Sequence, residues 1–252
     1  MIRALTLMLL TATPAMAEET IVAGLSENGV SITAGFTGEE IMIYGAVRRE
    51  APPPAGPPMQ VIVTIEGPSA PLVVRKKARR AGIWVNTDAV SIDSAPSFYA
   101  IASTVPLAGA LSEIDNLRYR ITIPRAIRAV GITGEADDAP SFVQALLRLR
   151  EADGSYRLTE GAVSLAEATL FRTDVALPSN LVEGDYRVRL FLTRGGHVVD
   201  WQEQVIPVRK AGLERAIFTL SRERPLAYGL LSVSLAVLAG WAAAALVRLL
   251  RP

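Results

Sequence analysis

The amino-acid sequence predicts a mainly β protein: immunoglobulin-like antiparallel sandwich lobes with a helical insertion, followed by one transmembrane α-helix. Short runs rich in Ile and Val, bounded by Gly, Pro and Asn, occur on both sides of a helical stretch at 106–153. Tyr186 follows a glycine turn at the start of a strand, as in the tyrosine corner of immunoglobulin-like sandwiches. Pro225–Val247 is long and apolar enough to span a bilayer.

The run Pro225–Val247 carries no charged residue. As a helix it would be roughly 34 Å long, which exceeds the roughly 30 Å of a hydrocarbon core. Tyr228 and Trp241 lie towards its ends, where aromatic rings can reach the headgroups. A buried helix of a soluble domain is the alternative, but such long uncharged runs are rare outside membranes. We therefore expect a single anchor at 225–247, followed by a cytoplasmic tail at 248–252.

Residues 1–17 have the three parts of a signal peptide in order: Arg3, the apolar stretch Ala4–Ala12, and Ala15-Met16-Ala17, which fits the small-x-small cleavage rule. An uncleaved N-terminal strand or anchor is the alternative. A leader followed by a stop-transfer helix predicts a periplasmic body held in the bacterial inner membrane. The five cations from Arg209 to Arg224 favour the opposite orientation, but long domains translocate largely regardless of charge.

Composition excludes several classes of function. The chain has 252 residues, enough for one large domain or two small ones besides the anchor. Lys and Arg total 26 and Asp and Glu total 25, so no strong net charge attracts nucleic acid. The absence of cysteine excludes disulfides, thiol catalysis and thiolate metal sites. We expect no nucleic-acid partner and no cofactor.

The segment 18–105 is expected to form an N-terminal β-rich lobe. Its predicted strands are Val30–Gly35, Glu40–Val47, Gln60–Glu66, Leu72–Val74, Gly82–Asn86 and Ser97–Ser103. Both faces of Glu40–Val47 are largely apolar, which predicts a strand at the centre of a sandwich. The proline-rich stretch Ala51–Pro58 predicts a stiff exposed connection rather than a recognition motif.

A cluster of cations falls between two of these apolar runs, which places it at or near a hairpin tip. Its members are Arg75, Lys76, Lys77, Arg79 and Arg80. These side chains could meet phosphate headgroups or an anionic partner. They could equally form a solvated tip that discourages edge pairing, which is the interpretation we favour.

The segment 106–153 is predicted to be a helical insertion. Apolar residues recur at near-helical spacing around Ser112–Arg120. Asp138 is placed to cap a second helix, Ala139–Arg150, which Asp153-Gly154 then ends.

The segment 154–210 is expected to form a C-terminal β-rich lobe, with strands at Ser164–Leu177, Asp185–Thr193 and His197–Val208. The two strand-rich segments could close one sandwich or form two, and we expect two lobes in contact. An amphipathic stripe at 211–224 could then lie on the membrane surface or pack against the body.

The sequence contains little that indicates catalysis. His197 is the only histidine, and a lone histidine beside a glycine turn is usually structural or exposed. No nucleophile elbow, phosphate-binding loop or metalloprotease pair is present. We therefore predict no catalytic, cofactor or metal residues and a non-enzymatic role. The alternative is an envelope enzyme whose acids, or Ser and Lys, come together from distant residues.

Small residues recur every four positions along the anchor, at Ala236, Gly240 and Ala244, with Ser232 one turn earlier. This spacing allows two helix backbones to approach closely in lipid. The predicted partner is either a second copy of the chain, forming a homodimer, or a polytopic membrane protein. The alternative is that small residues are simply frequent in membrane helices.

Several stretches together resemble the alphaproteobacterial transmembrane protein family: FTGEEIMIYGAV, GIWVNTDAVSIDSAPSFYAIAST, LPSNLVEGDYRVRLFLTRGGHVV and GLERAIFTLSRERPLAYGLL. The resemblance extends from about Phe36 to the anchor. It implies an envelope protein with a leader and one membrane helix, and it supplies no catalytic residues. It also implies an association with sulfite-exporter-type permeases, and therefore an accessory or protein-interaction module that serves a membrane transporter.

Overall fold

The computed structural model describes residues 19–27, 29–33, 36–50, 52, 56–128, 139–210, 217 and 220–250. The predicted leader, the cap Asp138 and most of the segment 211–224 lie outside these residues. The strands are β1 (Glu19–Leu25), β2 (Val30–Ile32), β3 (Glu39–Arg49), β4 (Met59–Glu66), β5 (Ser69–Arg80), β6 (Ile83–Pro96), β7 (Tyr99–Ser103), β8 (Tyr156–Glu160), β9 (Ser164–Ala166), β10 (Leu170–Leu177), β11 (Gly184–Arg194) and β12 (His197–Lys210). The helices are α1 (Leu107–Ala110), α2 (Glu113–Tyr119), α3 (Ile123–Ala126), α4 (Ala139–Ala152) and α6 (Pro225–Leu250).

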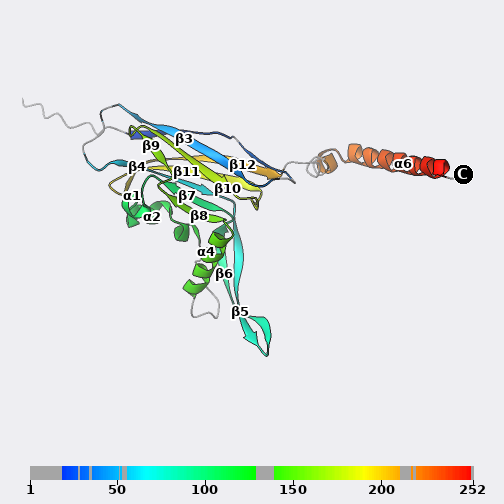
Figure 1. Cartoon of the computed structure of the whole chain (residues 1–252), viewed down its shortest axis with the longest axis horizontal. Helices are drawn as coiled ribbons and strands as arrows, with labels where there is room; N and C mark the ends of the chain where they lie inside the picture. Colours follow the sequence, from blue (N-terminus) through cyan, green and yellow to red (C-terminus); the bar gives the residue numbers. More distant parts are fainter. Residues whose placement is uncertain are drawn as a thin grey trace, which may run out of the picture.

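The strands form two sheets and a separate hairpin (Figure 1). Sheet A has the order β1-β3-β10-β9, and sheet B has the order β2-β12-β11-β4-β7-β8. The pairing is antiparallel except between β7 and β8 and between β2 and β12. The mainly β class with a C-terminal apolar helix is thus confirmed, whereas the immunoglobulin-like topology stays a prediction.

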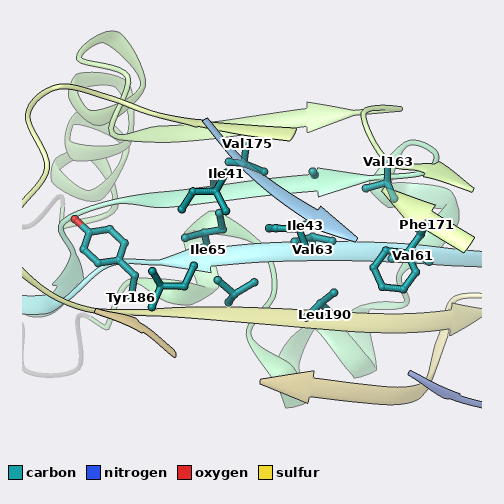
Figure 2. Close-up of a cluster of buried hydrophobic side chains, with 14 of the residues drawn as sticks. Ile41, Ile43, Val61, Val63, Ile65, Val163, Phe171, Val175, Tyr186 and Leu190 are labelled. Atoms are coloured by element: carbon teal, nitrogen blue, oxygen red, sulfur yellow. The ribbon is translucent and has the colours of Figure 1, made fainter. Parts of the chain in front are cut away.

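The strand-rich segments 18–105 and 154–210 share both sheets, so the expected pair of lobes is replaced by one sandwich. In sheet A, β3 pairs with β10, and in sheet B, β4 pairs with β11. Their inward side chains interdigitate in one core, drawn in Figure 2. This core draws on both segments, with Ile43 and Val63 from the first and Phe171 and Leu190 from the second.

The central position predicted for Glu40–Val47 is confirmed, because β3 has β1 on one side and β10 on the other. Ile41, Ile43 and Val47 point into the core. The opposite face carries Tyr44 and Ala46, which remain partly or fully exposed. Within the described chain, no further layer covers the second apolar face of this strand.

The predicted helical insertion is confirmed at 106–153 and forms a third layer on the outer face of sheet B (Figure 1). A second apolar cluster lies between them, with Phe191 from β11, Tyr99 from β7, Ile121 beside α3 and Leu146 from α4. Ser112 caps α2, because its hydroxyl accepts a hydrogen bond from the backbone N–H of Asp115 at 3.3 Å. Helices therefore cover sheet B, while the helices α1–α4 leave the outer face of sheet A free.

The tyrosine corner is present at the start of β11. The Tyr186 hydroxyl donates to the Val182 carbonyl at 2.9 Å, and the ring lies in the core beside Phe98. Burial raises the pKa of Tyr186 above its ordinary value of 10.0, so the phenol stays protonated and continues to donate. This bond fixes the loop that leads into β11.

The two sheets meet where β1, the edge strand of sheet A, lies beside the part of β12 that β2 leaves unpaired. The Asp200 carboxylate accepts from the backbone N–H of Ile21 at 2.8 Å, and the Gln204 amide donates to the Ala23 carbonyl at 2.9 Å. Side chains of one edge strand thus satisfy the backbone of the other, which joins the two sheets along this side.

Candidate interaction surfaces

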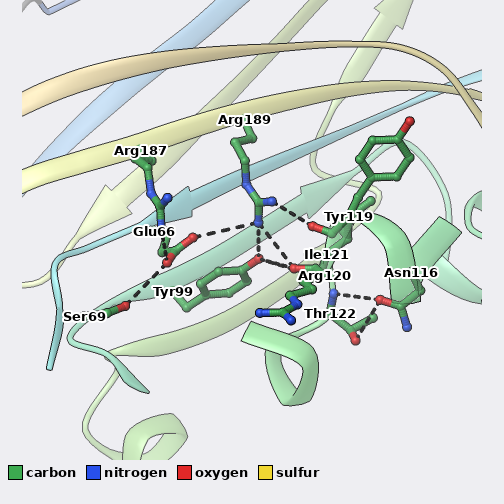
Figure 3. Close-up of polar contacts among 10 residues, drawn as sticks. All are labelled: Glu66, Ser69, Tyr99, Asn116, Tyr119, Arg120, Ile121, Thr122, Arg187 and Arg189. Carbon is green, nitrogen blue, oxygen red and sulfur yellow. Dashed lines mark hydrogen bonds and ion pairs between the residues drawn. The ribbon is translucent and has the colours of Figure 1, made fainter. Parts of the chain in front are cut away.

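The buried polar groups of sheet B attach the helical layer to the sandwich (Figure 3). Arg189 donates to the Tyr119 carbonyl at 2.8 Å, to the Arg120 carbonyl at 3.3 Å and to the Tyr99 hydroxyl at 3.0 Å. The Tyr99 hydroxyl in turn donates to the Ile121 carbonyl at 2.9 Å. Burial raises the pKa of Tyr99 to about 12, so this group is a permanent donor rather than a titrating acid or base.

The lone histidine has a structural partner, as predicted, and a largely exposed ring. Nδ1 of His197 lies 3.1 Å from the Asp115 carboxylate, which also accepts from the backbone N–H of Val198 at 3.1 Å. The Ser112 hydroxyl donates to the same carboxylate at 3.3 Å. Serine and histidine thus share the acid instead of bonding to each other, so no proton relay to a serine nucleophile is formed. Among the described residues, no group of three or more His, Asp or Glu side chains could hold a metal ion.

The predicted basic cluster lies along β5 of a long hairpin, leading up to the tip at Ala81 and Gly82. The hairpin projects away from the sandwich in Figure 1. All five cations are exposed, and no carboxylate of the described chain forms an ion pair with any of them: Arg75, Lys76, Lys77, Arg79 and Arg80.

Strand alternation divides these cations between the two faces of the hairpin. Arg75, Lys77 and Arg79 share one face, and Arg79 stands directly opposite Trp84 of β6. Trp84 is 68% exposed and Ile83, next to the tip, is 65% exposed. Sequence reasoning placed the cations between two apolar runs but did not predict that Ile83 and Trp84, which follow the glycine turn directly, would be exposed.

A groove of about 490 Å³ separates β5 from α4 and continues the basic surface. Arg75 and Lys76 contribute from the hairpin, and Arg148 contributes from the helix. Phe142 and Leu149 supply apolar walls. A second cleft of about 540 Å³ opens between α1–α3 and α4, with Glu113, Arg125 and Glu151 among its lining residues.

The outer face of sheet A carries an apolar patch formed by Val22, Tyr44, Ala46 and Leu170, which we call the sheet A patch. A cleft of about 530 Å³ runs through it, lined by carbon-rich side chains of β1, β3 and β10. The Tyr44 ring lies over Gly24, where an added Cβ would come within 3.1 Å of the ring. Small residues thus form the floor of the cleft and large ones its walls.

The C-terminal helix α6 begins at Pro225, as predicted, and its 26 residues correspond to roughly 39 Å. The segment Pro225–Ala242 is long and apolar enough to cross a membrane, and none of it is buried against the rest of the described chain. The Ser232 hydroxyl bonds back to the Tyr228 carbonyl at 2.9 Å, within the helix.

Comparison with known protein families bears on the role of α6. Residues 20–249 match the family described as Putative transmembrane protein (Alph_Pro_TM). The chain belongs to this family. In the described part of this Alph_Pro_TM protein, α6 is the one helix that is long and apolar enough to be its membrane span.

No curated protein matches the chain. Among solved structures, Spo0M, the sporulation control protein from Bacillus subtilis, is similar over 82% of this chain and 56% of its own length, with 11% identity and a TM-score of 0.28. The chain therefore spans little more than half of that structure. At this TM-score the likeness supports no conclusion about fold or function.

Within α6, the predicted small-residue face is exposed at Ala236 and Gly240, where an added Cβ on Gly240 would meet no atom within 4 Å. The side chain of Ala244 lies outside the described part of the helix. Packing of this face against another helix, in a homodimer or with a polytopic protein, stays a prediction.

Proposed function

We propose that this protein is a single-pass protein of the bacterial inner membrane whose periplasmic sandwich binds another inner-membrane protein without catalysing a reaction. The observation that carries this proposal is the uncovered sheet A patch on a body tethered to a bilayer. Exposed apolar patches with a cleft and an aromatic side chain are typical of protein-binding surfaces. Arg48, Arg172 and Asp174 give the patch a charged rim on the same face.

The described groups with displaced pKa values support a non-enzymatic role, because their contacts are structural. The Glu19 carboxylate joins the two sheets, and Tyr99 holds the helical layer. Tyr156 donates to the Pro96 carbonyl at 2.8 Å, and Tyr186 donates to the Val182 carbonyl. None of the four lines one of the clefts described above. An envelope enzyme with an acid-based or Ser/Lys-based site would need such groups in a cleft.

We take a polytopic transporter as the class of partner, with sulfite-exporter-type permeases tested first. The sequence resemblance supplies this suggestion. A single anchored chain beside a polytopic transporter could use both α6 and the sheet A patch, because both surfaces are exposed in the described chain.

A photocrosslinking amino acid at position 44 should report this contact in intact membranes. With the full chain, replacement of Tyr44 should give a discrete adduct containing a polytopic transporter, identified by mass spectrometry. Leu170→Arg, which places a charge in the cleft, should reduce the adduct at least tenfold. Val199 is the matched control position, because it lies on β12 and is 46% exposed, as is Tyr44.

Three outcomes would contradict the proposal. These are equal adducts from positions 44 and 199, adducts unaffected by Leu170→Arg, or an adduct with twice the mass of this chain and no other protein. The last result would indicate a homodimer through the sheet A patch.

The proposed topology predicts that the C-terminus lies in the cytoplasm. A fluorescent protein fused after Pro252 should be bright, and alkaline phosphatase fused at the same position should be inactive, because phosphatase folds only after export. An active phosphatase with a dark fluorescent fusion would place the tail outside and reverse the orientation of the sandwich.

A further inference from the structure

The β5–β6 hairpin starts at the end of the sandwich from which the chain continues to its membrane helix. At its base, Pro68 lies against Gly184, where an added Cβ would approach the proline ring to 2.7 Å. Gly184 pairs with Val208, close to the end of β12 at Lys210. The base of the hairpin thus lies near the end of β12, the last described strand before α6.

The lengths of the two segments allow the hairpin tip to reach the bilayer that holds α6. β5 has 12 residues and is about 40 Å long. Residues 211–219, which join β12 to the helical residues that begin at Leu220, can span at most about 32 Å. A hairpin and a connection of these lengths permit the tip to lie at the membrane surface.

The side chains of the tip have the chemistry of an interfacial membrane contact. Arg75, Lys77 and Arg79 share a face with Trp84, and none has a carboxylate partner in the described chain. Cations near an anionic leaflet gain Coulomb energy, and tryptophan prefers the headgroup region, where its ring is buried and its N–H remains bonded. A tip that needed only solubility would not expose both Ile83 and Trp84.

We infer that the tip of the β5–β6 hairpin docks on anionic phospholipid headgroups of the bilayer in which α6 is anchored. Trp84 and Ile83 enter the headgroup layer, and the cations of β5 contact the phosphates. The hairpin thereby supplies a second membrane contact besides α6 and limits the orientations of the sandwich. This proposal differs from the interpretation that we favoured from the cations alone, which was a solvated tip.

The experiment uses the full chain in lipid nanodiscs and exploits its lack of cysteine. Ile83→Cys carries an environment-sensitive NBD dye at the tip. Ile114→Cys carries the same dye on α2, at the opposite end of the sandwich near His197, and is similarly exposed, at 73% against 65%. The discs contain either phosphatidylcholine alone or phosphatidylcholine with one third phosphatidylglycerol.

The dye at position 83 should brighten and shift to the blue in the anionic discs only, and lipid-attached quenchers should reduce its emission. Replacing Arg75, Lys77 and Arg79 by Gln should lower the ratio of bound to free hairpin roughly a hundredfold, at about fivefold per cation. Salt at 0.5 M should act in the same direction, and Trp84→Ala should weaken the signal. The dye at position 114 should not respond.

Equal emission at position 83 in both kinds of disc, or insensitivity to the triple substitution, would overturn the inference. A dye that is silent in anionic discs but responds in native membranes would also overturn it and indicate an acidic protein instead. Because the discs contain no second protein, either result leaves the partner contact at Tyr44 unaffected. An unchanged circular dichroism spectrum for the triple variant would show that the sandwich is intact.

Discussion

Glu19→Gln should destabilise the sandwich by about 3 kcal/mol or more, because it removes a buried charge between two arginines. Glu19 lies at the start of β1 and is almost fully buried. Its carboxylate accepts from Arg49 of β3 at 2.7 Å and from Arg194 of β11 at 2.8 Å through both oxygens. Arg194 also donates to the Pro57 carbonyl at 2.8 Å, and Arg49 donates to the Ala168 carbonyl. One carboxylate thus joins sheet A to sheet B at this end of the sandwich.

Thermal unfolding of the full chain in detergent, followed by circular dichroism, measures the effect. A loss of about 3 kcal/mol corresponds to a fall in Tm of roughly 10 °C for a domain of this size. Glu203→Gln on β12 is the control, because that carboxylate is exposed and should change stability by less than about 0.5 kcal/mol. A Glu19→Gln variant that melts within about 2 °C of the parent would disprove the role of this group.

The same carboxylate makes stability depend on pH. Burial alone would raise the pKa of Glu19, but hydrogen bonds and charges from Arg194 and Arg49 outweigh it and hold the pKa below 4.5. A lowered pKa means that the stabilisation is present above about pH 4.5 and is lost as the pH falls through the value in the folded protein. The difference in Tm between parent and Glu19→Gln should therefore be largest at neutral pH and shrink below pH 4.5.

Arg189→Met should lower the free energy of unfolding by about 3 kcal/mol. The helical layer should open before the sandwich unfolds. The methionine keeps most of the apolar stem, but it removes the donor to the partly buried Tyr119 carbonyl and one of the two donors to the exposed Arg120 carbonyl. It also removes the guanidinium that lies over the Phe191 ring at 5.4 Å. Hydrogen exchange should show faster exchange at the amides of α2, with those of β4 and β10 less affected.

Arg187→Met is the matched control on the same strand. Arg187 bonds to Glu66 of β4 at 2.6 Å, but its side chain is half exposed, and this contact lies within sheet B rather than in the helical layer. Replacing Arg187 should lower the free energy of unfolding by about 1 kcal/mol and leave amide hydrogen exchange in α2 unchanged. Equal effects of the two substitutions on α2 would show that Arg189 does not hold the helices in place.

Local patterns were sufficient to predict the elements that depend on neighbouring residues. The apolar run of α6, the glycine turn before Tyr186 and the helical spacing of apolar residues around Ser112–Arg120 each depend on residues only a few positions apart. The β5–β6 hairpin was also predictable, because apolar runs flank its glycine turn. The full length of the hairpin was not predictable, because the distal parts of its strands are rich in Lys, Arg, Asn and Asp. These residues are extended because the two strands pair with each other.

Long-range pairing could not be predicted in the same way. Nothing near β3 indicates that its partner is β10, more than 120 residues further along the chain. Local sequence patterns therefore could not distinguish one sandwich from two lobes. β8 was missed because only Tyr156 at its start is buried, which leaves no alternating pattern. The sheet A patch was missed because both faces of β3 are apolar, and only the position of the helical layer shows which face stays uncovered.

Asp200 and Gln204 of β12 form side-chain hydrogen bonds to the backbone of β1, and these bonds also restrict how a partner can bind. Many binding modules recruit an extended peptide as an additional strand, which requires a row of free backbone donors and acceptors on a sheet edge. Along β1 and β12, part of that row is already occupied from within the chain. Recognition by strand addition is therefore disfavoured on this side, and so is edge-to-edge aggregation between neighbouring copies confined to one membrane plane.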